Sequence, residues 1–209
     1  MIRLLIADDH PVVRQGLRRI LTEAGDIHVV GEAENGDDVV RMLEGTSVDV
    51  LLLDISMPGP TSFLDLLKQV SARHPRLRAL VLSMHSEDQY ALRAFKAGAS
   101  GYLTKDRPPE ELLDAVRRIH GGGKYVSSAL AEKLVTGAQS AERLPHESLS
   151  DREYEVLCLL AAGNSIKEIG ARLTLSPKTV STYRARILEK MVFNSNADIV
   201  RYFVEHSLG

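Results

Sequence analysis

Aspartate carboxylates stand at two separated points of this 209-residue chain, each directly after a short apolar run. Asp8 and Asp9 follow residues 3–7, and Asp54 follows residues 50–53. A short run rich in leucine and valine is typical of a strand buried on both faces. Because an ionised carboxylate is expensive to remove from water, its position at the end of such a strand requires a reason.

Two more polar groups occupy equivalent positions. Ser83 ends the run 79–83, and Lys105 follows the run 101–104. The carboxyl ends of parallel strands meet at one edge of a sheet, so we expect these groups to line one polar crevice, with Asp54 at its mouth. Such a cluster could bind a hard cation, accept a phosphoryl group, or form a structural ion-pair network. A loop cap explains one aspartate well, but it explains four polar strand ends poorly.

The elements that must position these groups alternate along the first 120 residues. Five strand-like runs are separated by segments whose apolar residues recur at helical spacing. This order predicts an α/β fold, a five-stranded doubly wound parallel sheet with helices on both faces. We assign 1–120 to this domain and 121–148 to a short helix and linker, with the boundary between Gly137 and Ser148. The predicted strands are 3–7, 28–33, 50–53, 79–83 and 101–104.

The last segment, 149–209, contains no strand pattern. Capping boxes of the Ser-x-x-Glu type begin at Ser150 and Ser165, and Ser176 precedes Pro177 as a further helix start. We therefore predict a second, all-α domain of four helices, with a helix-turn-helix within 165–191.

The helix that begins at Pro177 has two distinct faces. A rotation of 100° per residue places Val180, Tyr183 and Ile187 on a core face. The outward face is small, polar and basic, which suits the major groove of DNA. Our candidates for base contacts are Lys178, Ser181, Thr182 and Ala185, and those for phosphate contacts are Thr179, Arg184, Arg186 and Lys190.

Composition limits the protein class. A chain with 44% hydrophobic and 26% charged residues is an ordinary globular one. The single cysteine, Cys158, excludes an internal disulfide framework and favours a reducing cytoplasm. The apolar start of the chain is too short for a signal sequence or a membrane span, so we expect no membrane partner. A net charge of −2 does not by itself indicate nucleic acid.

The motifs carry a family resemblance. Residues 1–120, with DDHP, LLLDISMP, LVLSMHS and GYLTKD in this order, resemble the flavodoxin-like receiver domain of two-component response regulators. Residues 149–209 resemble a LuxR-type helix-turn-helix domain. Together they resemble the NarL/FixJ family of transcriptional regulators. The resemblance implies that Asp54 accepts a phosphoryl group from a sensor histidine kinase. It also implies that the chain binds double-stranded promoter DNA and forms a homodimer when phosphorylated or on DNA.

The same resemblance implies a role for each polar residue. Lys105 pairs with the phosphoryl group, Ser83 donates its hydroxyl to it, and Tyr102 responds by burying its ring. We assign His10 to loop packing rather than to proton transfer. The implied ligands of Mg²⁺ (or Mn²⁺) are three carboxylates and one main-chain carbonyl: Asp8, Asp9, Asp54 and Ser56 (backbone).

One departure and two alternatives accompany this interpretation. Ser62 stands where the family usually has glycine, and Pro60 stiffens the same loop, which affects the expected loop conformation. A Mg²⁺-dependent aspartyl phosphatase would need a second aspartate where Ser56 stands. A protein with a vestigial receiver would be a DNA-binding regulator that acts independently of phosphorylation. We expect a regulator, with enzyme-like activity limited to self-phosphorylation and slow self-dephosphorylation.

Overall fold

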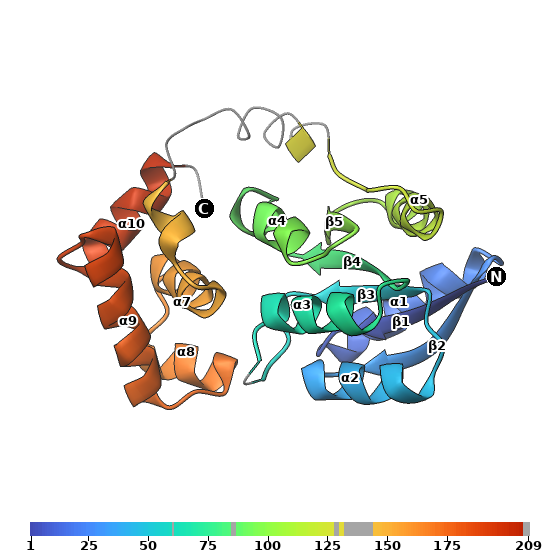
Figure 1. The fold of residues 1–209 in the computed structure, drawn as a ribbon, viewed down its shortest axis with the longest axis horizontal. Coiled ribbons are helices and arrows are strands. Elements are labelled where there is room, and N and C mark those ends of the chain that lie inside the picture. Colours follow the sequence, from blue (N-terminus) through green and yellow to red (C-terminus); the bar gives the residue numbers. More distant parts are fainter. Residues whose placement is uncertain (60, 85–86, 128–129, 132–143, 207–209) are drawn as a thin grey trace. The chain divides into compact units, whose positions relative to one another are not determined.

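Five parallel strands form the sheet of the first part of the chain (Figure 1). The computed structural model describes residues 1–59, 61–84, 87–127, 130–131 and 144–206. The chain divides into two compact units, Met1–Ala131 and Glu132–Gly209. In the sheet the order is β2-β1-β3-β4-β5, and each predicted strand is confirmed to within one residue. The strands are β1 (Ile2–Ala7), β2 (Ile27–Ala33), β3 (Val50–Asp54), β4 (Arg78–Ser83) and β5 (Gly101–Thr104).

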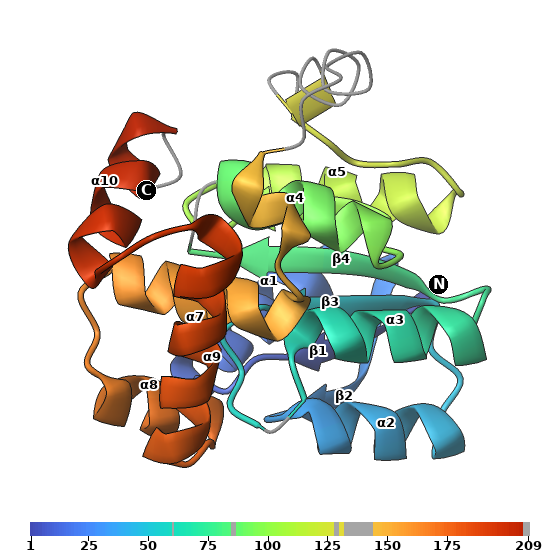
Figure 2. The same ribbon diagram turned by 60° about the vertical axis from the view of Figure 1, so that its left-hand side comes forward.

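Helices cover both faces of this sheet (Figure 2). On one face α1 and α5 pack against alternate strand residues such as Leu4, Leu52 and Leu82, which are almost completely buried. On the other face α2, α3 and α4 lie side by side. Since each buried strand contributes side chains to two hydrophobic layers, its sequence is apolar throughout. The helices are α1 (Pro11–Glu23), α2 (Gly36–Gly45), α3 (Phe63–Arg73), α4 (Glu87–Lys96) and α5 (Pro109–His120).

Ser62, the departure from the family pattern, has a local structural role. Its hydroxyl oxygen accepts a hydrogen bond from the Asp65 backbone N–H at 3.0 Å and donates to the Asp65 carboxylate at 2.9 Å. Ser62 is therefore the N-cap of α3, a function that glycine fulfils without a side-chain bond. Pro60 lies outside the described residues.

The segment after α5 returns along the edge strand β5. The Tyr102 N–H donates to the Tyr125 carbonyl at 3.2 Å, and the Tyr125 N–H donates to the Ser100 carbonyl at 3.0 Å. This pairing covers part of an edge that would otherwise expose backbone groups. Ser127 then caps a helical turn through the Leu130 N–H, and the remainder of the predicted short helix lies outside the described residues.

The described part of the second unit, residues 144–206, is helical, as predicted. Both capping boxes form in full at Ser150 and Ser165, and Ser176 caps the helix that starts with Pro177. None of the described helices combines the length and hydropathy of a membrane span. The helices are α7 (Asp151–Ala161), α8 (Ile166–Leu173), α9 (Pro177–Met191) and α10 (Asn196–Glu205).

The last residues of the predicted linker, Pro145–Ser148, are more regular than we predicted. Residues Pro145–Ser148 form the 3-10 helix η1 rather than an irregular segment. The His146 ring lies against the Tyr154 and Tyr202 rings, and its Nδ1 is 2.7 Å from the Tyr202 hydroxyl. This aromatic cluster fixes η1 onto α7 and α10, a contact that the small and polar local sequence did not indicate.

In the described part of the chain, two non-glycine residues adopt the left-handed conformation, and both cap helices of the helix-turn-helix. Thr174 ends α8 with φ 54°, and Val192 ends α9 with φ 57°. Glycine is the usual residue at such C-caps, because a Cβ is unfavourable there. Val192 is β-branched and 87% exposed, so packing compensates little of this strain.

Replacing Val192 with glycine is expected to stabilise the second unit by about 1 kcal/mol, because glycine removes the left-handed penalty. Scanning calorimetry of the full chain should show a higher melting temperature for that unit. The matched control is Val204→Gly, an exposed valine within α10, which should destabilise the unit by about 0.5 kcal/mol. A lower melting temperature for Val192→Gly would contradict the strain at this cap.

Candidate functional site

Asp54 is the last residue of β3 and pairs in register with Leu82 of β4. Its side chain is only 1% exposed, so the carboxylate is buried within the sheet edge. The expectation that Asp54 lies at the open mouth of a crevice was therefore wrong. The ammonium of Lys105 lies 3.1 Å from Asp54 Oδ1. This positive charge explains how a buried strand accommodates the carboxylate.

Asp8 shares the same lysine. Its Oδ2 accepts a hydrogen bond from Lys105 Nζ at 2.7 Å, and its Oδ1 accepts one from the His10 backbone N–H at 2.8 Å. Burial alone would lower the pKa of Lys105, but its bond to Asp8 and its attraction to Asp54 raise that pKa above the ordinary value. Lys105 therefore stays protonated and links strand ends that are 97 residues apart.

The pKa of Asp54 is raised by burial, and the nearby Asp8 carboxylate raises it further. The Lys105 charge and the Ser56 backbone N–H offset only part of this effect. Among the described residues, neither Asp54 oxygen accepts a hydrogen bond of ordinary geometry. The carboxylate thus retains free lone pairs in a buried position, where another positive group would stabilise it.

The donor atoms at this edge suit a divalent cation. Side-chain ligand atoms of Asp8, Asp9, His10 and Asp54 all lie within 4.8 Å of one another. Carboxylate oxygens are the donors that Mg²⁺ prefers, and Asp54, whose oxygens lack hydrogen bonds of ordinary geometry among the described residues, belongs to the same cluster. Ser56, whose carbonyl was the fourth predicted ligand, follows two residues after the end of β3.

The two predicted switch residues end the neighbouring strands. Ser83 and Tyr102 are completely buried. The Ser83 carbonyl accepts a hydrogen bond from the Lys105 backbone N–H at 2.8 Å, so the hydroxyl-bearing strand end and the lysine lie together. The structure therefore brings Asp8, Asp9, Asp54, Ser83 and Lys105 to one edge of the sheet, with the Tyr102 ring inside the domain.

Sequence reasoning missed Arg14, whose guanidinium is buried behind the acidic loop. Its Nη1 donates to the Asp8 backbone carbonyl at 2.7 Å, while the rest of the group pairs with Glu32 and Glu34 of the β2 region. These bonds fix the loop that carries Asp8 and Asp9. The local signal is weak, because a single arginine on the first turns of a helix is usually solvated.

His10 differs from its predicted packing role. Its side chain is 62% exposed, and its Nδ1 lies 2.9 Å from Asp9 Oδ1. It occupies the N-cap of α1 without a side-chain capping bond. The ring belongs to the acidic cluster.

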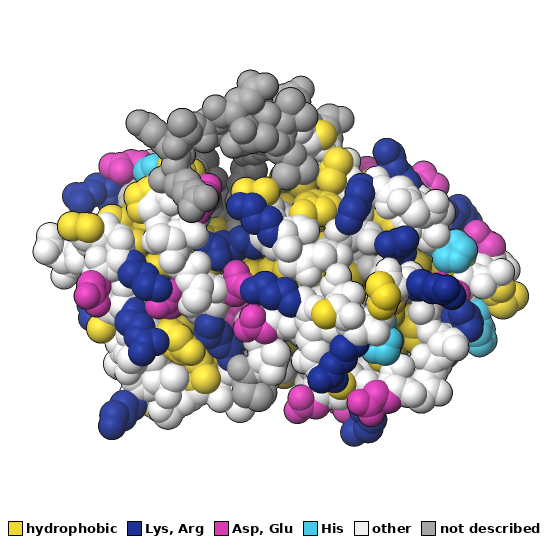
Figure 3. All heavy atoms as spheres, in the orientation of Figure 1, with side chains coloured by type: hydrophobic (Ala, Val, Ile, Leu, Met, Phe, Trp, Pro, Cys, Tyr) yellow, Lys and Arg dark blue, Asp and Glu magenta, His cyan; other side chains and the backbone are white. Residues whose placement is uncertain are grey.

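In the second unit α9 presents the predicted outward face. Val180 and Ile187 are completely buried, which fixes the orientation of the helix. Lys178 and Ala185 are exposed, as are Ser181 and Thr182, whose hydroxyls donate to backbone carbonyls one turn earlier at 2.9 and 3.0 Å. Figure 3 shows Lys and Arg side chains along the margin of the unit that α8 and α9 form.

The predicted phosphate contacts divide into two groups. Arg186 is exposed, but Arg184 donates to Asn196 at 2.7 Å and the Thr179 hydroxyl contacts that of Ser176 at 2.8 Å. Lys190 is exposed, but its ammonium lies 2.6 Å from the buried Glu153 carboxylate of the same unit.

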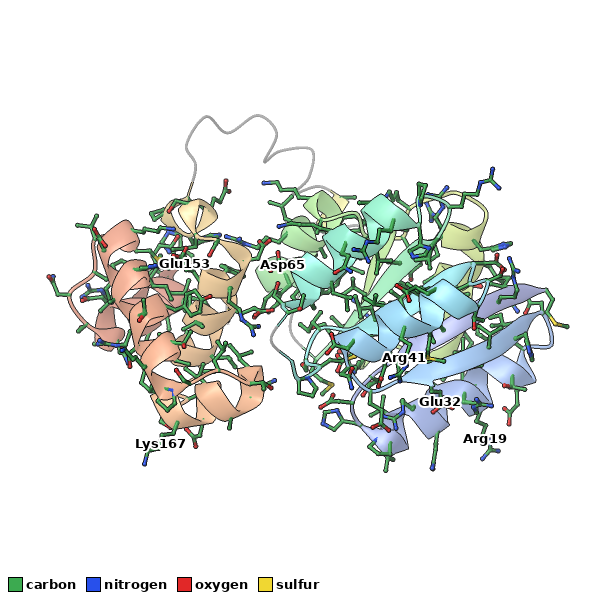
Figure 4. The ribbon with its side chains drawn as sticks, turned by 60° about the horizontal axis from the view of Figure 1, so that its bottom comes forward. Arg19, Glu32, Arg41, Asp65, Glu153 and Lys167 are labelled. Carbon is green, nitrogen blue, oxygen red and sulfur yellow. The ribbon has the colours of Figure 1, made fainter. Side chains whose placement is uncertain are left out.

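Glu153, at the start of α7 (Figure 4), is buried, which alone would raise its pKa. Its bonds to Lys190 and Ser150 lower that pKa below the ordinary value. The pair thus joins the start of α7 to the end of α9, and Lys190 has a structural function whatever it does on DNA.

Comparisons with known proteins agree with both halves of this geometry. Residues 4–117 match the family model of the response regulator receiver domain. Residues 147–203 match the model of the luxR family of bacterial regulatory proteins.

Relatives align over the full length. The response regulator UvrY of Escherichia coli K12 is 35% identical over 210 residues, covering 100% of this chain and 96% of its own. The response regulator GacA of Pseudomonas aeruginosa is 34% identical, with 100% and 98% covered. A structure of RcsB from Salmonella enterica serovar Typhimurium, bound to promoter rprA with the phosphomimetic BeF3−, has a TM-score of 0.69 at 28% identity and covers 96% of this chain and 97% of RcsB.

Proposed function

Since this chain belongs to the NarL/FixJ family of two-component response regulators, which bind DNA, we propose that phosphorylation of Asp54 controls its binding to promoters. The observation that supports this most strongly is the convergence of three strand ends on one buried carboxylate. Asp54 has free lone pairs, a lysine at 3.1 Å and two further aspartates beside it. A structural ion pair does not require the additional carboxylates.

In the proposed reaction an Asp54 oxygen attacks the phosphorus of a phosphohistidine on a sensor kinase. A P–O bond forms, the P–N bond breaks, and the imidazole nitrogen keeps the bonding pair. Mg²⁺ or Mn²⁺, held by Asp8, Asp9, Asp54 and the Ser56 carbonyl, would neutralise charge on the phosphoryl oxygens. Lys105 would then pair with the phosphoryl group, and Ser83 would donate its hydroxyl to it.

For DNA, we propose that α9 enters the major groove of promoter DNA with Lys178, Ser181 and Thr182 nearest the base edges. Of the predicted phosphate contacts, Arg186 and Lys190 are exposed, and the Lys190 ammonium is paired with Glu153. The apolar residues of α10 differ in burial, since Ile199 is buried in the unit and Val204 is 75% exposed. The exposed side suits a homodimer on DNA, and RcsB dimers have been seen on two parallel DNAs. Such a regulator would act in the cytoplasm.

The test combines phosphorylation with DNA selection. The full chain, treated with acetyl phosphate and Mg²⁺, would be used to select binding sites from random duplexes. Phosphorylation is expected to tighten binding to the selected site about tenfold, a normal coupling between two sites. Asp54→Asn should show no such gain. If wild-type affinity were independent of phosphorylation, the receiver would be vestigial.

A further inference from the structure

His10 gives the acidic cluster a nitrogen donor that the hard-cation site does not need. Its Nδ1 lies 2.9 Å from Asp9 Oδ1 and 3.4 Å from Asp8 Oδ1. Two ligands at right angles around a dication, with bonds of about 2.1 Å, stand about 3.0 Å apart. The imidazole nitrogen is therefore placed as a neighbouring ligand would be. We infer that His10 is an additional metal ligand that makes this site favour borderline transition-metal dications, of the Co²⁺ and Zn²⁺ class, over Mg²⁺.

The imidazole nitrogen of His10 is the donor that would make the site prefer Co²⁺ and Zn²⁺ to Mg²⁺. Mg²⁺ takes oxygen ligands and retains several waters, so an imidazole adds little to its binding. Co²⁺, Ni²⁺ and Zn²⁺ accept imidazole readily, and three carboxylates with one imidazole are a mixed set that suits them. An ion pair between His10 and Asp9 would explain the 2.9 Å distance between their side chains. It would not explain why the Asp54 carboxylate lies in the same cluster.

Asp54 supplies an independent indication of a bound cation. It is 1% exposed, and among the described residues its oxygens lack hydrogen bonds of ordinary geometry while lying within the same 4.8 Å cluster. The His10 ring is 62% exposed and forms no capping bond for α1, so neither burial nor helix capping accounts for its position. The inference rests on the proposed cation site and concerns which metals it selects.

The test compares two metals on the full-length protein by isothermal titration calorimetry. His10→Ala should weaken Co²⁺ binding about tenfold, as loss of a metal-site contact commonly does, while Mg²⁺ affinity changes less than about twofold. In proton NMR the Co²⁺-loaded wild type should show a strongly shifted imidazole N–H signal that His10→Ala lacks. The control is His28→Ala, which removes an exposed histidine of β2 that pairs with Arg3, near the opposite end of β1. It should leave both affinities and the shifted signal unchanged.

The possible failures are distinguishable. If His10→Ala changed neither affinity, or weakened Mg²⁺ and Co²⁺ equally, His10 would not be a selective ligand, although the proposed site for Mg²⁺ would stand. If wild-type protein bound neither metal, both the proposed cation site and this inference would be overturned.

Discussion

Asp54→Asn is expected to incorporate no phosphoryl group from acetyl phosphate and Mg²⁺, whereas the wild type incorporates one per chain. The amide that replaces the carboxylate is nearly the same size but has no anionic oxygen to attack phosphorus. Because the neighbouring Lys105 and Asp8 still pair with each other at 2.7 Å, the fold should persist. Intact-mass spectrometry of both proteins, with circular dichroism to verify folding, measures the effect.

Two matched variants make this result specific to the site. Asp37→Asn removes an exposed carboxylate of α2 in the same unit and should leave incorporation unchanged. Asp9→Ala removes a proposed cation ligand and should slow incorporation without abolishing it, since the nucleophile remains. Equal labelling of wild type and Asp54→Asn would show that another residue accepts the phosphoryl group.

The receiver fold was predictable because its signals are local. Each buried parallel strand appears as an apolar run, and the polar residue that follows it marks the edge where the site forms. The helix starts at Ser150 and Ser165 were equally clear, because a capping box is complete within four residues. The contact of His146 with Tyr202 escaped prediction, since it joins residues 56 positions apart.

The proximity of the polar strand-end residues could be predicted from the sequence, but the pattern of ion pairs among them could not. The motifs indicated that Asp54 and Lys105 lie together, but not that the lysine also bonds Asp8 within a buried network. Arg14 and Lys190 show the limit most clearly. Each is a basic residue on a helix, and the sequence around it is typical of a solvated position. In the structure each is bound by acidic residues from another part of its unit. Such pairing depends on how helices pack, which periodicity along one helix does not specify.

The triple variant with alanine at positions 178, 181 and 182 is expected to lose at least about 100-fold in affinity for the selected DNA site, since each good base contact contributes about 1–3 kcal/mol. Lys178, Ser181 and Thr182 are exposed on α9 and contribute nothing to its buried face. Alanine is the best helix former, so the helix itself should remain stable. Fluorescence anisotropy on selected and unrelated duplexes, over a range of salt concentrations, measures the change.

The decisive comparison is with Arg186→Ala, which removes an exposed charge from the same helix. This variant should weaken binding to both duplexes by a similar factor and reduce the slope of log affinity against log salt by about one. In the triple variant, the affinities for the selected and the unrelated duplex should instead become similar. The slope of log affinity against log salt should fall only by the contribution of the Lys178 charge. Lys190→Ala is unsuitable as this control, because it would leave the buried Glu153 without its ammonium partner and alter the unit itself. If the triple variant still distinguished the two duplexes as the wild type does, α9 would not read the bases through these side chains.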